Sequence, residues 1–319
     1  MNNLQKKAVD LAMAGHNLFI TGQAGTGKTF VLKEMISVLR QSGRKVAVLC
    51  TTGMASLNFL NFGATTVHRW AGLYDGRYHS SELKDLVLRD DRYDHVRKNA
   101  CDADVIIIDE VSMLSKKIFE QLELVCRTAM GNHQLFGGTQ IISCGDFRQL
   151  RPVKNDLYND PGLYCFQSDI WTSVFPHRCH LVDVMRQDEQ ELIIAIDETA
   201  RGAVSDETHN LLKSLDRPLL TDVQPLHLCA HNADAQWYNS EKLGDPEKVY
   251  HANVSGTHKY LKRIIAPNYL AIKIGCPVIL LINLSSTLVN GLHDIVKSYD
   301  DNSIGVHFPD IKETYSQET

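Results

Sequence analysis

The sequence predicts an α/β protein whose core is a parallel β-sheet covered by helices on both faces. In the first half of the chain, short apolar runs alternate with helical stretches, which is typical of such a sheet. The 319 residues suffice for two domains. With 44% apolar and 22% charged residues, the composition is that of an ordinary globular chain. Ligands of parallel sheets bind at the carboxyl ends of the strands, so functional residues are expected there.

Regular elements are clearest in the first half. Apolar runs predict four strands, at 17–21, 45–50, 104–109 and 139–144. Helical patterns predict helices over 28–41 and near 115–130. Residues 74–103 are rich in charge and contain one weak helical pattern, so we expect a surface insertion there.

The second half is less regular. We expect a helix near 187–201 and a strand at 226–230, whereas 241–270 carry no strong pattern. The apolar run 276–284 predicts a buried strand. The Asn-Gly pair within 289–296 predicts a β-turn that leads into a further strand.

Composition excludes several classes of protein. The net charge of −5 gives no global attraction to nucleic acid, so a polyanion would need a local groove. No apolar run approaches the roughly 20 residues that cross a bilayer, and the start lacks a secretory apolar segment. We therefore expect an intracellular protein without a membrane partner. The eight cysteines are scattered without a CxxC pair, which predicts reduced core residues.

The segment GQAGTGKT fits the pattern GxxxxGK[ST] of a phosphate-binding loop, between an expected strand and an expected helix. Its glycines let backbone N–H groups wrap a phosphate, and the helix N-terminus adds positive charge. We expect Lys28 to reach the β- and γ-phosphates and the Thr29 hydroxyl to hold Mg²⁺. A glycine-rich turn with an incidental lysine is the alternative. The expected nucleotide-binding residues of the loop are Gly22, Gln23, Ala24, Gly25, Thr26, Gly27, Lys28 and Thr29.

Two adjacent carboxylates end the apolar run VIIIDE. Burial of Asp109 and Glu110 at a strand tip is costly unless a cation compensates them. Asp109 therefore fits a Mg²⁺ ligand, usually through water, and Glu110 fits the base that orients an attacking water. The alternative is a solvated acidic turn. Glu110 also disfavours a phosphate-loop kinase, which would transfer the phosphoryl group to a bound acceptor.

Residues 51–73 join hydroxyl side chains to aromatic rings directly after the expected strand 45–50. Thr51 and Thr52 could offer hydroxyl and N–H groups to phosphates of DNA. Phe59, His68 and Trp70 could stack on bases. Each ring has a core position as its alternative.

Four segments in order carry a family resemblance: GQAGTGKT, TTGMASLN with TTVHRWAGL, IIIDEVSML and GDFRQLRPV. They resemble motifs I, Ia, Ib, II and III of the Pif1 family of superfamily 1B DNA helicases. Residues 171–202 are similar to the signature segment of that family, and 266–296 look like its later segment ending in NG. The resemblance covers nearly the whole chain.

The resemblance implies a P-loop NTPase with two RecA-like domains. Residues 1–180 would form the first domain (1A) and residues 181–240 the beginning of the second (2A). Residues 241–319 would form a β-rich, insertion-like segment with a polar tail, which leaves the second domain incomplete. Its cofactors would be ATP and Mg²⁺.

The resemblance also implies an activity. The chain would move 5′ to 3′ on single-stranded DNA, driven by ATP, and unwind 5′-tailed duplexes, with roles in DNA repair and recombination. Gln5 matches the adenine-reading glutamine of the family, although a polar helix residue is the alternative. Arg186 would be an arginine finger, and Gln149 would bind the γ-phosphate in a turn that begins with Asp146. Arg201 would be a structural or surface arginine.

Two departures from the family pattern limit these expectations. We find no segment resembling TIHKSQGQT or YVALSRA, the later motifs V and VI. Arg148 and Arg151 replace the Phe and Pro of the commoner form GDFFQLPPV. We therefore expect Mg-ATP binding, weak hydrolysis and impaired unwinding. An ATP-dependent switch on single-stranded DNA or a protein partner remains the alternative. A nuclear location is expected, with the mitochondrion as the alternative, and the oligomeric state stays open.

Overall fold

The computed structural model describes most of the chain, in residues 1–218, 226–254, 267–282, 284, 285 and 287–307 and in the backbone of 314–318. Its contacts divide the chain into two units, Met1–Arg217 and Pro218–Thr319. Every helix in the described ranges is too short or too polar to cross a membrane. The domain boundaries expected after residues 180 and 240 stay predictions.

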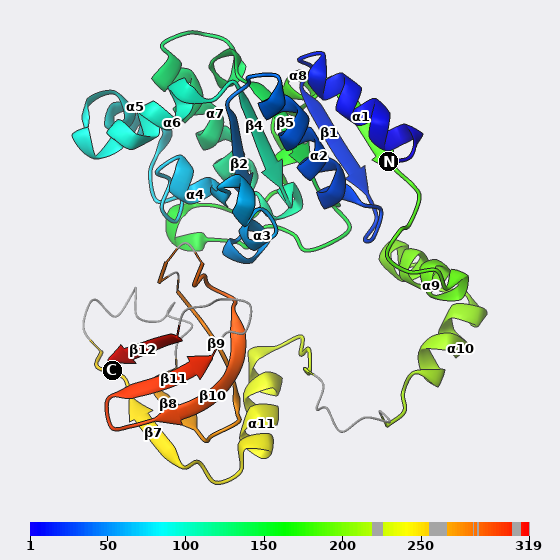
Figure 1. Cartoon of the computed structure of the whole chain (residues 1–319), viewed down its shortest axis with the longest axis vertical. Coiled ribbons are helices and arrows are strands. Elements are labelled where there is room, and N and C mark those ends of the chain that lie inside the picture. Colours follow the sequence, from blue (N-terminus) through cyan, green and yellow to red (C-terminus); the bar gives the residue numbers. More distant parts are fainter. Residues whose placement is uncertain (219–225, 255–266, 283, 286, 308–313, 319) are drawn as a thin grey trace. The chain divides into compact units, whose positions relative to one another are not determined.

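The first unit is built on a six-stranded parallel sheet in the spatial order β3-β2-β4-β5-β1-β6. Figure 1 labels its four central strands, β2, β4, β5 and β1. The strands are β1 (Leu18–Gly22), β2 (Val46–Cys50), β3 (Thr65–Thr66), β4 (Val105–Asp109), β5 (Gln140–Cys144) and β6 (His177–Leu181). The sheet confirms the predicted α/β class and the four predicted strands. Because all strands run the same way, the ends of β1, β4 and β5 bring the motif residues to one edge.

One face of this sheet is covered by α1 (Asn3–Met13) and α2 (Lys28–Gln41). Leu32 of α2 belongs to the same buried cluster as Ile20 of β1 and Ile107 of β4. Since strand residues alternate between faces, the neighbours of Ile20 and Ile107 point to the opposite side. These apolar contacts hold the start of α2 beside the end of β1.

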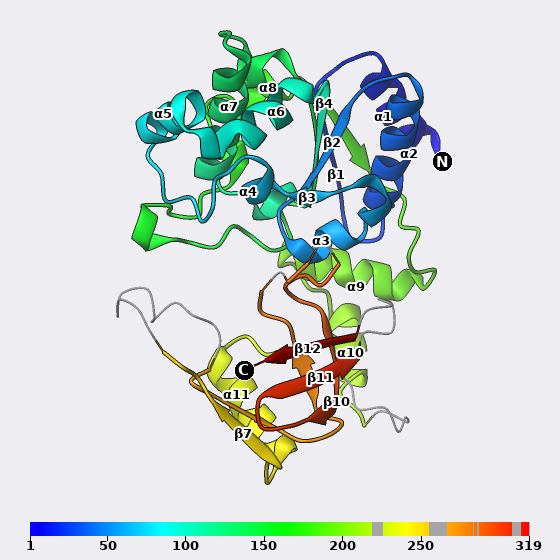
Figure 2. The ribbon, with the colours of Figure 1, turned by 60° about the vertical axis from the view of Figure 1, so that its left-hand side comes forward.

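The other face is covered by helices that come later in the chain (Figure 2). These are α4 (Val67–Trp70), α5 (Ser80–Arg89), α6 (Asp94–Asp102), α7 (Lys116–Met130) and α8 (Trp171–Val174). Ile106 and Ile108 of β4 pack there with Phe119 and Leu122 of α7. Three further helices of this unit are α3 (Gly53–Leu57), which follows β2, and α9 (Gln190–Arg201) and α10 (Asp206–Ser214), which follow β6. The helices predicted near 115–130 and 187–201 are confirmed.

Residues 74–103 are not the surface insertion that the sequence predicts. They form α5 and α6, which bury Leu83, Val87, Val96 and Ala100 in the core against α7. The apolar residues recur four positions apart, so each helix presents one narrow stripe to the core. Charged residues lie between these apolar positions and face outward, so the helical pattern is weak in the sequence.

The edge strand β6 is an element that the sequence analysis missed. It pairs in parallel with β1, from Leu18 with His177 to Gly22 with Leu181. Only Cys179 and Leu181 of its residues are buried. An edge strand with alternating exposed polar residues lacks the continuous apolar run of the central strands.

The second unit contains one described helix and two antiparallel sheets. The helix is α11 (Asn232–Leu243). Its strands are β7 (Lys248–His251), β8 (Tyr269–Ile272), β9 (Pro277–Ile279), β10 (His293–Tyr299), β11 (Ser303–His307) and β12 (Thr314–Glu318). β7 pairs with β8, and the other sheet has the order β12-β11-β10-β9. The small sheets agree with the expected β-rich segment.

Two strand predictions in this unit are wrong and one turn is confirmed. Residues 226–230 form no strand, and Leu226 and Leu228 are exposed. The buried strand expected over 276–284 is reduced to β9, an edge strand whose Ile279 is exposed; residue 283 lies outside the described residues. The predicted turn forms, because Leu292 N–H donates to the Val289 carbonyl and Gly291 has a φ of 97°.

The cysteines are all free, in agreement with the sequence prediction. Cys50, Cys126, Cys144, Cys165 and Cys179 are buried. Cys101 and Cys229 are exposed, so the prediction of core positions is wrong for these two, which lie outside the apolar strands.

Candidate functional site: a nucleotide pocket

The phosphate loop connects β1 to α2 at the carboxyl edge of the sheet. Gly27 is the N-cap residue of α2 and has a left-handed conformation, with a φ of 80°. No side chain caps the helix, so its first N–H groups stay available to an anion. This is the arrangement that the sequence pattern predicts.

Gly25 allows a second segment to approach the loop closely. A Cβ atom at Gly25 would lie 2.9 Å from Cβ of Arg186, and its φ of 84° also disfavours other residues. The Met185 N–H donates to the Gly25 carbonyl at 2.7 Å. The chain after β6 is therefore hydrogen-bonded to the phosphate loop, and this contact places Arg186 at the pocket.

Lys28 holds the loop in its present conformation. Its Nζ donates to the carbonyls of Gly22 and Gln23 at 2.8 and 3.1 Å. The Thr26 hydroxyl donates to the same Gln23 carbonyl at 2.9 Å and is buried. A phosphate bound in the loop offers Lys28 a charged acceptor in place of these neutral carbonyls, and charge-assisted bonds are stronger.

The carboxylates of Asp109 and Glu110 lie in different surroundings. Asp109 ends β4 and is only 2% exposed. Burial, together with the neighbouring charge of Glu110, raises the pKa of Asp109 to about 6. Glu110 lines the pocket and has a left-handed backbone with a φ of 53°, a strained conformation for a side-chain-bearing residue.

Gln149 lies in a turn that Asp146 organises. The buried Asp146 carboxylate accepts from Gln149 Nε2 at 3.2 Å and from the Arg148 N–H at 3.1 Å. The Gln149 N–H donates to the Asp146 carbonyl at 2.9 Å. Asp146 thus positions the Gln149 amide, which lines the pocket.

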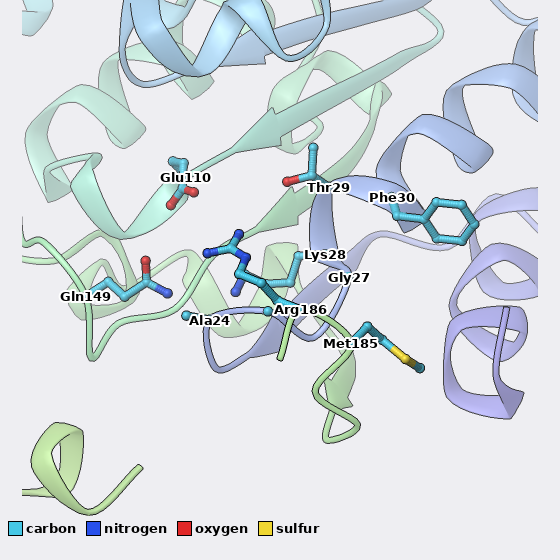
Figure 3. A pocket seen from close by; sticks show the side chains of 10 residues that line it. Ala24, Gly27, Lys28, Thr29, Phe30, Glu110, Gln149, Met185 and Arg186 are labelled. Carbon is cyan, nitrogen blue, oxygen red and sulfur yellow. The ribbon is translucent and has the colours of Figure 1, made fainter. Parts of the chain in front are cut away.

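A pocket of about 380 Å³ lies between the phosphate loop, Glu110, Gln149 and Arg186, and Asp109 is not among its lining residues (Figure 3). Four predicted catalytic residues, Lys28, Glu110, Gln149 and Arg186, line it with Thr29 of the metal prediction. Four separate segments contribute them, so a ligand there contacts all of these segments at once. Of the remaining loop residues, Ala24, Gly25 and Gly27 also line the pocket.

Phe30 and Met185 are lining residues that the sequence analysis missed. They are 49% and 56% exposed and point to the same side of the pocket in Figure 3. The sequence signal is the aromatic residue directly after the GKT of the phosphate loop, and its exposure is known only from the structure. The two side chains give an otherwise polar pocket an apolar end.

Gln5 lies behind the phosphate loop, where its side chain is only 3% exposed. Its N–H and amide oxygen form a capping box with Asn2, which starts α1. Its Nε2 donates to the Thr26 carbonyl at 3.4 Å. The helix-residue alternative therefore describes what Gln5 does here, and adenine reading stays a prediction that requires these bonds to change.

The predicted DNA-binding residues divide into polar and core positions. Thr51 donates from its hydroxyl to the Glu110 carbonyl at 3.1 Å, and Thr52 caps α3. Phe59 and Trp70 are buried in the two core clusters, so neither ring presents a face to a base. His68 is half-buried, and burial lowers the pKa of its imidazole.

Replacing Asp109 with Asn is expected to stabilise the nucleotide-free and Mg²⁺-free protein at pH 7.5. The folded-state pKa of about 6 lies above the usual 3.8, so the stability linked to Asp109 is complete below pH 4 and lost as the pH rises through 6. Asn imitates the protonated acid, so the free energy of unfolding rises by about 3 kcal/mol at pH 7.5 and by only about 0.5 kcal/mol at pH 4. Urea unfolding at both pH values measures this. An equal change at both would contradict a raised pKa.

Comparison with known proteins identifies the group of sequences to which the chain is similar. Residues 1–210 match the family described as PIF1-like helicase. The chain is 35% identical over 301 residues to the ATP-dependent DNA helicase PIF1 of Saccharomyces cerevisiae strain YJM789, covering 90% of this chain and 34% of that protein. It is 30% identical over 312 residues to human PIF1, covering 95% and 47%. The chain thus spans a third to a half of these relatives.

Solved structures agree with the sequence comparison. The crystal structure of Pif1 helicase from Candida albicans superimposes with a TM-score of 0.80 at 26% identity, covering 100% of this chain and 78% of that chain. Pif1 helicase from Bacteroides, in complex with ADP-AlF3 and single-stranded DNA, also gives 0.80 at 26% identity, with 99% and 74% covered. The motifs, the six-stranded parallel sheet and the pocket lining agree with these similarities, and the chain belongs to the PIF1-like helicase family.

Proposed function

We propose that this chain is the ATP-hydrolysing part of a DNA helicase that moves 5′ to 3′ on single-stranded DNA. The observation that carries the proposal is the meeting of Lys28, Glu110 and Arg186 in one pocket beside an uncapped helix N-terminus. A cationic side chain, a carboxylate base and an arginine around bound phosphates are the parts that phosphoryl hydrolysis requires. Family membership and the similarity to ATP-dependent DNA helicases support it.

The pocket has two ends suited to the two parts of ATP. The N–H groups of the loop and the start of α2 would bind the phosphates. Phe30 and Met185 offer exposed apolar surface at the other end, which suits the face of a nucleobase. The family's relatives include a structure with bound ADP-AlF3, which supports a nucleotide at this position.

The residues present fit a Mg²⁺ ion. Asp109 is a buried carboxylate beside a second carboxylate. The positive charge of Lys28 lowers the pKa of Asp109 and so partly offsets the rise caused by burial and Glu110. A hard cation there would compensate both carboxylates, and oxygen ligands are those that Mg²⁺ prefers. Thr29 and Asp109 would hold the ion, which would neutralise charge on the β- and γ-phosphate oxygens.

Three side chains would act on the γ-phosphate. Glu110 would orient a water and take its proton, since its carboxylate lines the pocket. Gln149 would donate its amide N–H groups to the γ-phosphate, and Arg186 would stabilise the charge that develops in the transition state. Arg186 reaches the pocket through the backbone bond between Met185 and Gly25.

Contact with DNA would be transmitted to the catalytic carboxylate, Glu110, through Thr51. This residue follows β2, where the family's DNA-contacting motif is expected, and it donates to the Glu110 carbonyl. A change at Thr51 therefore alters the backbone that carries the catalytic carboxylate. Relatives have been crystallised with single-stranded and forked double-stranded DNA, which supports DNA as the partner.

Single-stranded DNA is expected to accelerate ATP turnover by about tenfold or more, the usual size of coupling between two sites. Turnover is measured with and without a poly-dT oligonucleotide, and unwinding is compared on 5′-tailed and 3′-tailed duplexes. Stimulated turnover supports the proposal of an ATP-hydrolysing part, and any unwinding should favour the 5′-tailed duplex. ATP and DNA binding without turnover would instead indicate a switch, and preference for the 3′ tail would reverse the polarity.

A further inference from the structure

We infer that Arg148 is a positioning residue that links the Gln149 turn to helix α9 through Asp197, so that nucleotide occupancy changes how firmly α9 is held. This inference rests on the proposed nucleotide site, because Gln149 lines that pocket. Arg148 has no part in the phosphate chemistry described above. Its side chain points from the turn to a different element.

Arg148 lies between two carboxylates from distant parts of the chain. Its Nη1 donates to Asp197 Oδ1 at 3.0 Å, and its Nε lies 3.6 Å from Asp146 Oδ1. Asp197 also accepts from Arg201 at 2.9 Å on its other oxygen. Opposite charges thus alternate from the turn to α9, in the order Asp146, Arg148, Asp197 and Arg201.

Helix α9 depends on such contacts because it is weakly packed. Ala195 is the only one of its 12 residues that is buried. Arg148 and Asp197 line a pocket of about 870 Å³, which α9 shares with Gly22 of the phosphate loop. Leu192, Ile193 and Ile196 of α9 are only half-buried, so polar links carry a larger share of its attachment than they would for a core helix.

The chain just before α9 is fastened to the nucleotide site. Met185 is bonded to Gly25, and the Asp183 carboxylate accepts from the side chain of Asn2 at 2.7 Å. The Arg148 to Asp197 pair adds a second attachment within the helix itself. Because the segment before α9 is bonded to the phosphate loop, α9 can rotate about its N-terminal end when the Gln149 turn moves.

The turn gives the link two states. In the present structure Asp146 accepts from the Gln149 amide. If Gln149 turns its amide to a γ-phosphate, Asp146 loses that donor, and the Nε of Arg148 is the nearest cationic replacement. A guanidinium has donors for two carboxylates, so Arg148 can close on Asp146 while it keeps Asp197. Nucleotide binding would then draw α9 toward the turn.

Hydrogen exchange of the α9 amides, with and without ADP and aluminium fluoride, tests this link. In the unsubstituted protein the nucleotide is expected to slow exchange over residues 190–201 by about fivefold, a typical coupling between sites. Arg148→Gln and Asp197→Asn should each remove this change, and the double variant should lose no more than either single one. Arg148→Lys, which keeps the charge, should retain part of it.

Two controls separate the link from other effects. Arg151→Gln removes the same charge from an exposed arginine of the same segment, for which the described residues provide no ion pair, and should leave the change intact. Arg201→Gln removes the outer partner of Asp197 without touching the turn. Retention of the change in folded Arg148→Gln, or its equal loss in Arg151→Gln, would overturn the inference.

Nucleotide affinity distinguishes this inference from the proposed function. Binding of a fluorescent ATP analogue is measured on every variant. Arg148→Gln should weaken it by no more than about fivefold, the size of the coupling itself, since Arg148 does not line the nucleotide pocket. No binding to the unsubstituted protein would contradict the nucleotide site itself. Binding without any change in α9 exchange would contradict only the link.

Discussion

Replacing Lys28 with Ala is expected to reduce ATP turnover by about a thousandfold or more. In the structure, Lys28 Nζ donates to two loop carbonyls, which places the ammonium at the mouth of the loop. The β- and γ-phosphates would attract it from there, and no other lysine lines the described part of the pocket. Without it, the charge that develops in the transition state loses a cationic partner. Steady-state phosphate release measures the effect.

Controls for Lys28 address charge and folding separately. Lys33→Ala removes a positive charge from the same helix at a residue that faces the Phe59 ring, and should leave turnover near the unsubstituted value. Lys28→Met keeps most of the side-chain volume but removes the charge, so it should be as inactive as Lys28→Ala. Thermal unfolding verifies that both variants are folded. Unchanged turnover in either one would remove Lys28 from the phosphate site.

Replacing Glu110 with Gln is expected to preserve ATP binding and to lower hydrolysis by about a hundredfold or more, the usual contribution of a general base. Gln has nearly the shape of Glu and can occupy the same strained backbone, but it cannot take a proton from water. It also removes one of the two negative charges beside the phosphates. ATP affinity should therefore stay equal or increase, while single-turnover hydrolysis slows.

The Glu110 experiment has a matched control and two contrary outcomes. Glu34→Gln makes the same change in α2, at a residue that does not line the nucleotide pocket, and should change neither binding nor hydrolysis. Loss of ATP binding in Glu110→Gln would indicate that the carboxylate is structural. Hydrolysis at the unsubstituted rate would show that another group positions the water.

The central strands and the phosphate loop were predictable because their signals are local. Strands buried on both faces need continuous apolar runs, and the loop needs glycines where the backbone turns into a helix. Gly27 shows this directly, since its left-handed conformation begins α2. Elements with weaker signals were missed or misjudged: β6 buries only Cys179 and Leu181, and the charges of α5 and α6 obscure narrow apolar stripes.

The aromatic residues show why burial could not be predicted from composition. Trp70 and Phe59 follow β2 in a segment rich in polar residues, and the sequence allowed either a core position or an exposed face. The structure places both in the core, whereas Phe30, which carried no such expectation, is exposed at the pocket. Which side of an element a ring occupies depends on what packs against that element.

The sequence by itself determined the α/β class, the phosphate loop and the paired carboxylates, because each depends on residues that are neighbours in the chain. Only the tertiary structure decided what meets across the sheet. It placed Arg186 beside Gly25, Thr51 against the Glu110 backbone and Arg148 against Asp197. Those contacts join residues 161, 59 and 49 positions apart, and they arise because parallel strands and the segments that follow them end at one edge.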